Sequence, residues 1–157
     1  MKNKFVVLLI ILTLLTAGAG GFIAYKVIKT DNDEITVDVG NGQTERVISV
    51  NELNLAPGGE KSVSIKFTRK TEDAAKITLE FEQTEDGELK NYVTVIIAAG
   101  DHVETAELKD LLGGKVVSFD ESVEKMTITY KMHEDAGNEA QGAKIRFDVR
   151  VKVSTEE

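Results

Sequence analysis

The residues best suited to chemistry lie together near the end of the chain, in the stretch MHEDAGNEAQG from Met132 to Gly142. A His followed directly by a Glu begins the signature of zinc peptidases, in which a second His four residues after the first completes the site on one helix. His133 and Glu134 match the first two positions, but Gly137 stands where the second His is needed. Glycine also disfavours a helix, so the stretch does not predict a zinc peptidase.

The same stretch is rich in side-chain oxygen, which calcium prefers. Glu134, Asp135, Asn138 and Glu139 could supply ligands, although their spacing differs from that of an EF-hand, and calcium stays an open alternative. The simpler interpretation is a structural turn motif made of Gly137, Asn138, Glu139, Gln141 and Gly142. In it the two polar amides bond to loop backbone, and the two glycines adopt conformations that other residues avoid.

The other chemically interesting side chains are isolated. His102 lies in a predicted polar turn, and Ser122 lacks the Gly-x-Ser-x-Gly context of a hydrolase nucleophile. Glu80 and Glu82 share one face of a predicted strand, where nothing else supports a glycosidase pair. We therefore assign no catalytic residue, no cofactor and no metal ligand, and we expect a protein that is not an enzyme.

A row of basic side chains follows the outer face of the last predicted strand, and consists of Lys144, Arg146, Arg150 and Lys152. We expect this row to pair across strands with Glu80 and Glu82, because opposite charges on neighbouring strands attract. The alternative is that the row binds a wall polyanion or an acidic partner.

Strict alternation of apolar and polar residues must position these side chains. It is clearest in four segments: 62–68, 75–82, 125–132 and 143–153. Weaker strand patterns cover 34–39, 45–53, 91–99 and 115–119. Successive side chains of a strand point to opposite faces, so each segment is predicted to bury one face and expose the other.

One segment has helical spacing instead. Leu108, Leu111 and Leu112 recur as on one helix face and are followed by Gly113 and Gly114, which predicts a short helix with a glycine stop. About eight short strands separated by Gly-, Asn- and Pro-containing turns favour an all-β fold, an antiparallel β-sandwich of jelly-roll or immunoglobulin-like type, over residues 35–157.

The first 25 residues predict a signal peptide or a transmembrane anchor helix. Lys2 and Lys4 precede an apolar run from Phe5 to Leu15, and Ala17-Gly18-Ala19 resembles a signal cleavage site, with Ala17 and Ala19 as its small residues. If the segment is not cleaved, residues 5–25 are long enough to span a bilayer. Residues 26–34 are predicted to be a linker, and either outcome places the domain outside the membrane.

Composition narrows the possible partners. The chain has 157 residues and no Cys, so disulfides and thiolate zinc sites are excluded. Residues 1–30 hold four Lys and no acid, which leaves 15 basic and 27 acidic residues in the remainder, a net charge of −12. A domain this acidic repels phosphate backbones, so nucleic acid is not an expected partner.

Four short motifs resemble the exported TasA/camelysin-like proteins of Gram-positive bacteria and related exported sandwich proteins. They are GAGGFIAY after the apolar run, LNLAPGGEKSVSIKF, AELKDLLGG and GNEAQGAKIRFDV. The chain departs from the family after its Ala-Tyr pair, where many members continue with Phe, a hydroxyl residue and Asp, and this chain reads AYKVIKTD.

This resemblance implies a jelly-roll or immunoglobulin-like sandwich that is secreted or tethered to the outer face of the cell membrane. It implies a role in biofilm matrix, surface fibres or adhesion, with self-assembly by strand addition or with other matrix and cell-wall components as partners. The alternative that it implies is a secreted metal-dependent hydrolase of camelysin type.

Overall fold

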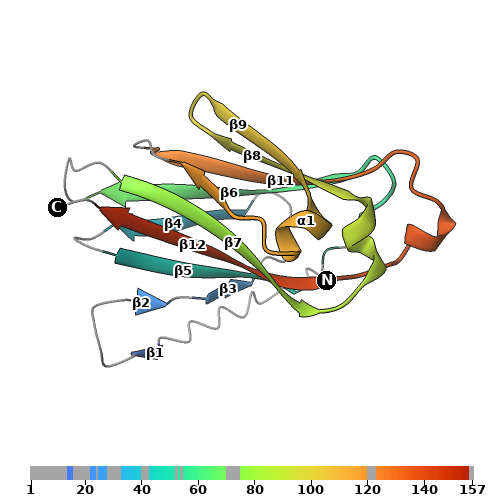
Figure 1. The fold of residues 1–157 in the computed structure, drawn as a ribbon, viewed down its shortest axis with the longest axis horizontal. Helices are drawn as coiled ribbons and strands as arrows, with labels where there is room; N and C mark the ends of the chain where they lie inside the picture. Colours follow the sequence, from blue (N-terminus) through green and yellow to red (C-terminus); the bar gives the residue numbers. More distant parts are fainter. Residues whose placement is uncertain are drawn as a thin grey trace, which may run out of the picture.

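Two five-stranded β-sheets form the body of the protein (Figure 1). The computed structural model describes residues 14–15, 22–23, 25–27, 33–39, 43–51, 53, 55–69, 75–119 and 123–155. One sheet, here the β12 sheet, has the strand order β10-β7-β12-β5-β3, and the other, the β11 sheet, has the order β4-β6-β11-β8-β9. The predicted all-β sandwich is therefore confirmed.

The strands of the β12 sheet are β3 (Tyr25–Val27), β5 (Gln43–Val50), β7 (Ala75–Glu85), β10 (Val117–Phe119) and β12 (Arg146–Thr155). Those of the β11 sheet are β4 (Asp33–Val39), β6 (Glu60–Arg69), β8 (Val93–Ala99), β9 (His102–Glu107) and β11 (Lys125–Met132). Most neighbours are antiparallel, whereas β3 lies parallel to β5 and β4 lies parallel to β6.

Consecutive strands from β4 to β12 cross from one sheet to the other at every connection except one. That exception is the β8–β9 hairpin, whose two strands pair directly. The last strand, β12, lies between β7 and β5 in the middle of its sheet. Segments far apart in the sequence are therefore neighbours throughout the two sheets.

The predicted alternation is what builds the core. In β11 and β12 the side chains alternate between buried and accessible along nearly the whole strand. Tyr130 of the β11 sheet packs edge-to-face on Phe147 of the β12 sheet with ring centroids 5.6 Å apart, and Phe147 stacks on Phe81 at 6.2 Å. Such aromatic pairs contribute about 0.5–1.5 kcal/mol each beyond the burial of their area. Burial raises the pKa of Tyr130, so its phenol stays protonated.

The predicted short helix is confirmed as α1 (Leu108–Leu112), with Leu108 and Leu111 fully buried. Gly113 caps it, and Gly114 follows with a φ of 104°, in the left-handed region that glycine adopts at low cost. Two 3₁₀ turns were not predicted, η1 (Glu88–Tyr92) and η2 (Asn138–Ala140). Gly87, before η1, leaves no room for a Cβ atom, which would meet the carbonyl group of Lys144.

The expectation for His102 differs from the structure. His102 is the first residue of strand β9 rather than part of a polar turn. Four of the six residues of HVETAE are exposed, and they lie on both faces of the strand. The sequence therefore has no alternation of apolar and polar residues from which a strand could be predicted.

The predicted leader helix falls largely outside the described residues, as do Ala17 and Ala19. The described positions of residues 1–25 are extended, in β1 (Leu14–Leu15), β2 (Phe22–Ile23) and the start of β3. Of the predicted linker 26–34, Lys26 and Val27 belong to β3, and β4 begins at Asp33. Among the described residues, no helix has the length and hydropathy needed to cross a membrane.

Candidate functional site

His133 lies in a three-residue cluster where β8, β9 and the end of β11 meet. Its Nε2 atom is 3.0 Å from Thr94 Oγ1 and 3.1 Å from Glu107 Oε2. Thr94 Oγ1 in turn donates a hydrogen bond of 3.0 Å to Glu107 Oε1. We call Thr94, Glu107 and His133 the His133 cluster. Its position follows from the pairing of Met132 with Val93, which brings the end of β11 beside the start of β8.

A hydroxyl, an imidazole and a carboxylate are also the parts of a nucleophilic triad, so the geometry matters. In a triad the hydroxyl and the carboxylate bind different ring nitrogens, and the nitrogen that faces the hydroxyl is free to take its proton. Here both partners face Nε2, and the Thr94 hydroxyl donates to Glu107. Nε2 must then carry a hydrogen and donate it. The cluster links β8, β9 and the end of β11, and its imidazole does not take the proton of the Thr94 hydroxyl.

The acidic stretch after His133 forms a compact loop closed by backbone hydrogen bonds. Ala136 N donates to His133 O at 3.3 Å, and Gln141 N donates to Asn138 O at 3.1 Å. Gly142 has a φ of 74°, as the predicted turn motif requires. Gly137 does not fit that prediction, because its φ of −74° and ψ of −176° suit other residues equally. Glu139 belongs to η2 and is exposed.

The end of β11, from which the loop departs, is hydrogen-bonded to the turn that precedes β6. Gly58 N donates to Met132 O at 3.2 Å, and Met132 N donates to Gly59 O at 2.9 Å. Glu134 and Asp135 are exposed. Within the described part of the chain, no three His, Cys, Asp or Glu side chains are grouped so that they could hold a metal ion. The alternative of a calcium site therefore receives no support from the arrangement of this loop.

Arg150 and Lys152, two members of the predicted basic row, form ion pairs with neighbouring strands as predicted, whereas Lys144 precedes β12. Arg150 Nη2 lies 2.8 Å from Glu82 Oε2 on β7, and Arg150 Nη1 lies 2.9 Å from Glu45 Oε1 on β5. Lys152 Nζ lies 2.7 Å from Glu80 Oε2. The hydrogen bonds to Glu82 and then to Glu45 raise the pKa of Arg150, so its guanidinium group stays charged.

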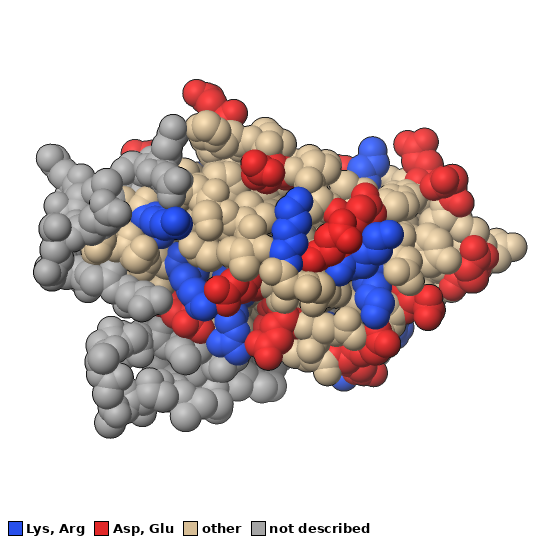
Figure 2. All heavy atoms as spheres, viewed as in Figure 1, with Lys and Arg blue, Asp and Glu red and all other residues tan. Residues whose placement is uncertain are grey.

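A third basic residue, Arg146, extends this row toward the end of the sheet. Arg146 Nη1 lies 2.9 Å from Glu85 Oε2, and Arg146 Nε donates to the carbonyl oxygen of Asn51 at 2.9 Å. We call the whole set the charged ladder; it comprises Glu45, Glu80, Glu82, Glu85, Arg146, Arg150 and Lys152. Basic and acidic side chains accordingly lie against one another on the face shown in Figure 2. Glu80 and Glu82 each hold a cation, and neither is placed as the free acid or base of a glycosidase.

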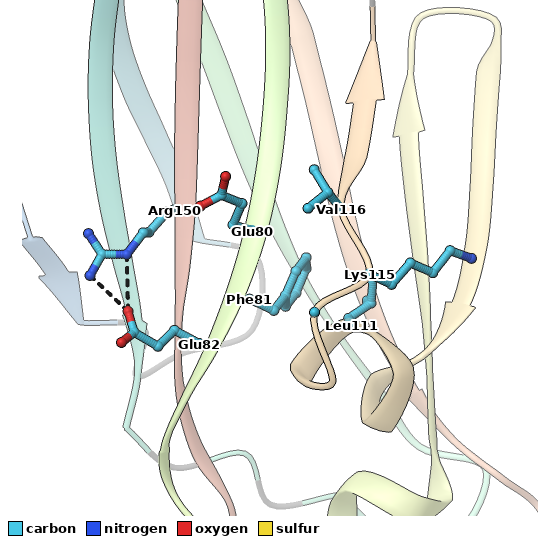
Figure 3. Close-up of a pocket in the computed structure, with 8 residues that line it drawn as sticks. Glu80, Phe81, Glu82, Leu111, Lys115, Val116 and Arg150 are labelled. Atoms are coloured by element: carbon cyan, nitrogen blue, oxygen red, sulfur yellow. Dashed lines mark hydrogen bonds and ion pairs between the residues drawn. The ribbon is translucent and has the colours of Figure 1, made fainter.

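A pocket of about 280 Å³ lies beside the ladder, between β7 and the segment that leads from α1 to the start of β10. Figure 3 shows the ring of Phe81 directed toward Leu111 and Val116, while Glu82 turns the other way to Arg150. Val116 is 50% exposed. The side of the pocket away from Arg150 is thus mainly apolar. The acidic residues of the pocket, Glu80 and Glu82, are paired with cations. Polar groups therefore do not converge on the space inside the pocket as they do in typical ligand sites.

Sequence reasoning found one partner of each contact and missed the other. Glu107 was not linked to His133, because β9 was not predicted and the register of β8 on β11 cannot be read from periodicity. Glu45 was not linked to Arg150, because β5 was only a weak prediction. The signal available for both was the alternation of side chains between the two faces of a strand. It places the two members of each pair on the same outer face.

No protein-family model matches the chain, and no curated protein matches it. Among solved structures, the full extracellular region of zebrafish Gpr126/Adgrg6 aligns with a TM-score of 0.46 and 12% identity over 82% of this chain, which spans 15% of that chain. PliG of Aeromonas hydrophila, a periplasmic inhibitor of g-type lysozyme, aligns with a TM-score of 0.37 and 11% identity over 78% of this chain and 99% of that one.

The tomato aspermy virus structure aligns with a TM-score of 0.37 and 10% identity over 72% of this chain and 79% of that one. At these identities and TM-scores, the three alignments identify neither a family nor a function for this chain.

Proposed function

We propose that the protein is an exported, non-enzymatic β-sandwich that serves as a surface, adhesion or biofilm-matrix component of a bacterial cell. The observation that carries the proposal is that the side chains best suited to catalysis hold strands together instead. Glu80 and Glu82 bind Lys152 and Arg150, and the His133 cluster joins three strands through one ring nitrogen.

Two features of the sequence support the location. Two Lys precede an apolar run that ends in small residues, the order found in secretory signals. The remainder carries a net charge of −12, which keeps a protein soluble at high local concentration. The motif resemblance to TasA/camelysin-like proteins adds the expectation of a role in matrix or surface fibres.

The location is tested by expressing the full chain in a Gram-positive host and separating medium, cell surface, membrane and cytoplasm. We expect the protein in the medium or on the surface, where external protease degrades it in intact cells. The mass of its N-terminus tests the leader: cleavage after Ala19, or within the next two residues, gives one mass, and an uncleaved anchor gives the full-length mass. Protein confined to the cytoplasm would contradict the proposal.

The absence of catalysis is tested on the same protein purified without chelators. We expect less than stoichiometric zinc and no hydrolysis of casein that a chelator can block. Stoichiometric zinc together with chelator-sensitive hydrolysis would instead support a secreted metal-dependent hydrolase of camelysin type. His133→Gln is the matched variant, since such a hydrolase would lose both metal and activity on that change.

A further inference from the structure

Strand β9 (His102–Glu107) has no buried residue, unlike every other strand whose burial the structure describes. It ends the strand order of the β11 sheet, and within the described residues no strand pairs with its outer side. In Figure 1 the β8–β9 hairpin stands at the margin of the molecule. Four of its six residues are exposed and two are half-buried, and Val103 is 61% exposed. In β8, by contrast, every second residue is buried.

The register of the hairpin determines which backbone groups of β9 face outward. Gly100 and Asp101 form a two-residue turn, with a φ of 60° at Gly100, and the strands close on the pair Ala99 and His102. A two-residue turn closes on a hydrogen-bonded pair, and hydrogen-bonded pairs alternate along an antiparallel ladder. Glu104 and Ala106 therefore bond to β8, whereas Val103, Thr105 and Glu107 direct their N–H groups away from it.

The strand carries the charges of Glu104 and Glu107 but lacks the other features that usually protect an edge. Such features are Pro, Lys, a bulge or a very short strand. β9 contains neither Pro nor Lys, and its pairing with β8 runs without interruption from Thr94↔Glu107 to Ala99↔His102. The edge strand β10 of the other sheet is only three residues long.

The sequence of β9 can pair with its own copy, running antiparallel, without placing like charges directly opposite each other. Opposite residues must share a face, and with Thr105 opposite its own copy, Val103 meets Glu107 and Glu104 meets Ala106. The three outward-directed positions of each strand then face those of its partner. A register that places Glu104 opposite itself brings two carboxylates together and is disfavoured.

We infer that β9 is a dimerisation edge, at which a second copy of this chain adds its own β9 antiparallel about a two-fold axis at Thr105. The pairing joins two β11 sheets into one sheet of ten strands. The inference rests on the proposed function in one respect: it names the contact through which such a surface component associates with itself. Because the chain carries a net charge of −8, the two copies repel at long range, and added salt strengthens the dimer.

A single introduced cysteine tests the register, since the chain has none of its own. In a hydrogen-bonded pair the Cα atoms are about 5.5 Å apart, within the range of about 4.4–6.8 Å that a disulfide spans. Full-length Thr105→Cys is expected to oxidise to a disulfide-linked dimer. Thr36→Cys is the matched control, because Thr36 is also an exposed Thr on the same sheet, on the opposite edge strand. Equal cross-linking of the two variants would overturn the register.

A charge at the same position tests the dimer itself. Thr105→Lys places two ammonium groups opposite each other and is expected to raise the dimer dissociation constant about tenfold or more, measured by sedimentation of the full chain. Thr36→Lys is expected to change it less than about twofold. A wild-type chain that stays monomeric at high concentration and high salt would refute the inference and leave the proposed location untouched. Fibres that persist in Thr105→Lys would also refute it, while supporting a matrix role.

Discussion

The outer faces of the two sheets meet the same solvent with different chemistry. The β12 sheet carries the charged ladder, in which one cation, Arg150, holds acids from the strands on both sides. The centre of the β11 sheet carries hydroxyl groups, with Ser62 opposite Thr129 and their oxygens 2.9 Å apart. The difference teaches that side-chain length decides which partner is reached. Arg150 and Lys152 bind acids placed diagonally on the adjacent strands, whereas the short hydroxyls of Ser62 and Thr129 reach only the residue directly opposite.

The largest expected effect comes from removing the cation at the centre of the ladder. Arg150→Met keeps much of the apolar stem but leaves Glu82 and Glu45 without their partner, and Glu45 is only 22% exposed. We expect a loss of about 2 kcal/mol in the free energy of unfolding, measured by urea denaturation. Arg146→Met is the matched control, and because Arg146 is 59% exposed it should cost about 0.5 kcal/mol or less. Equal losses would show that position in the ladder does not matter.

A smaller effect is expected on the hydroxyl face. Thr94→Val keeps the shape of the side chain but deprives both His133 and Glu107 of a hydrogen-bond partner. We expect a loss of about 1 kcal/mol in the free energy of unfolding. Thr127→Val makes the same change at a half-buried position of the same face and should cost less, since it leaves the His133 cluster intact. If Thr127→Val costs as much, the cluster adds nothing to stability.

The salt dependence of stability should differ between the two faces. Raising ionic strength to about 1 M shortens the screening length to about 3 Å. The stability difference between the wild type and Arg146→Met should therefore shrink, because that exposed pair is screened. The difference between the wild type and Thr94→Val should change less, since part of it comes from the neutral hydroxyl. Urea denaturation of both pairs at low and high salt measures this, and parallel shifts would remove the distinction.

The smallest effect concerns the turn between β7 and η1. Hydrogen bonds from Lys90, Gln83 and the Gly87 N–H hold the pKa of Asp86 below its ordinary value of 3.8. A carboxyl with a lowered folded pKa stabilises the protein above its unfolded pKa, and this contribution is lost as pH falls through the folded pKa. Asp86→Asn should therefore lower the melting temperature slightly at pH 7, and the difference between the two proteins should shrink as pH falls below 3.8. A difference that does not shrink on acidification would contradict the assignment.

The sequence predicted those parts of the molecule in which burial is one-sided. Val149 and Val151 alternate with Arg150 and Lys152 because one face of β12 packs in the core and the other meets water. The same parity allowed the pairing of Arg150 with Glu82 to be expected before the register was known. β9 was missed for the converse reason: a strand with no fully buried residue leaves no period in its sequence.

The His133 cluster could not be predicted from any single segment of the sequence, because its three residues come from three segments. His133 follows β11, Glu107 ends β9, and Thr94 is the second residue of β8. Their meeting depends on two registers, Met132 with Val93 and Thr94 with Glu107. The expectation of a loop after His133 required only glycine chemistry, and there Gly142 behaves as predicted while Gly137 does not.

The central place of the last strand has a consequence for how the chain matures. β12 supplies the middle of its sheet, and both β5 and β7 lose a neighbour without it. A polypeptide that emerges N-terminus first, from a ribosome or through a secretion channel, cannot complete this sheet until residues 146–155 are released. A chain delivered from its N-terminus therefore stays incompletely folded until residues 146–155 have emerged. An incompletely folded chain is what passage through a narrow pore requires.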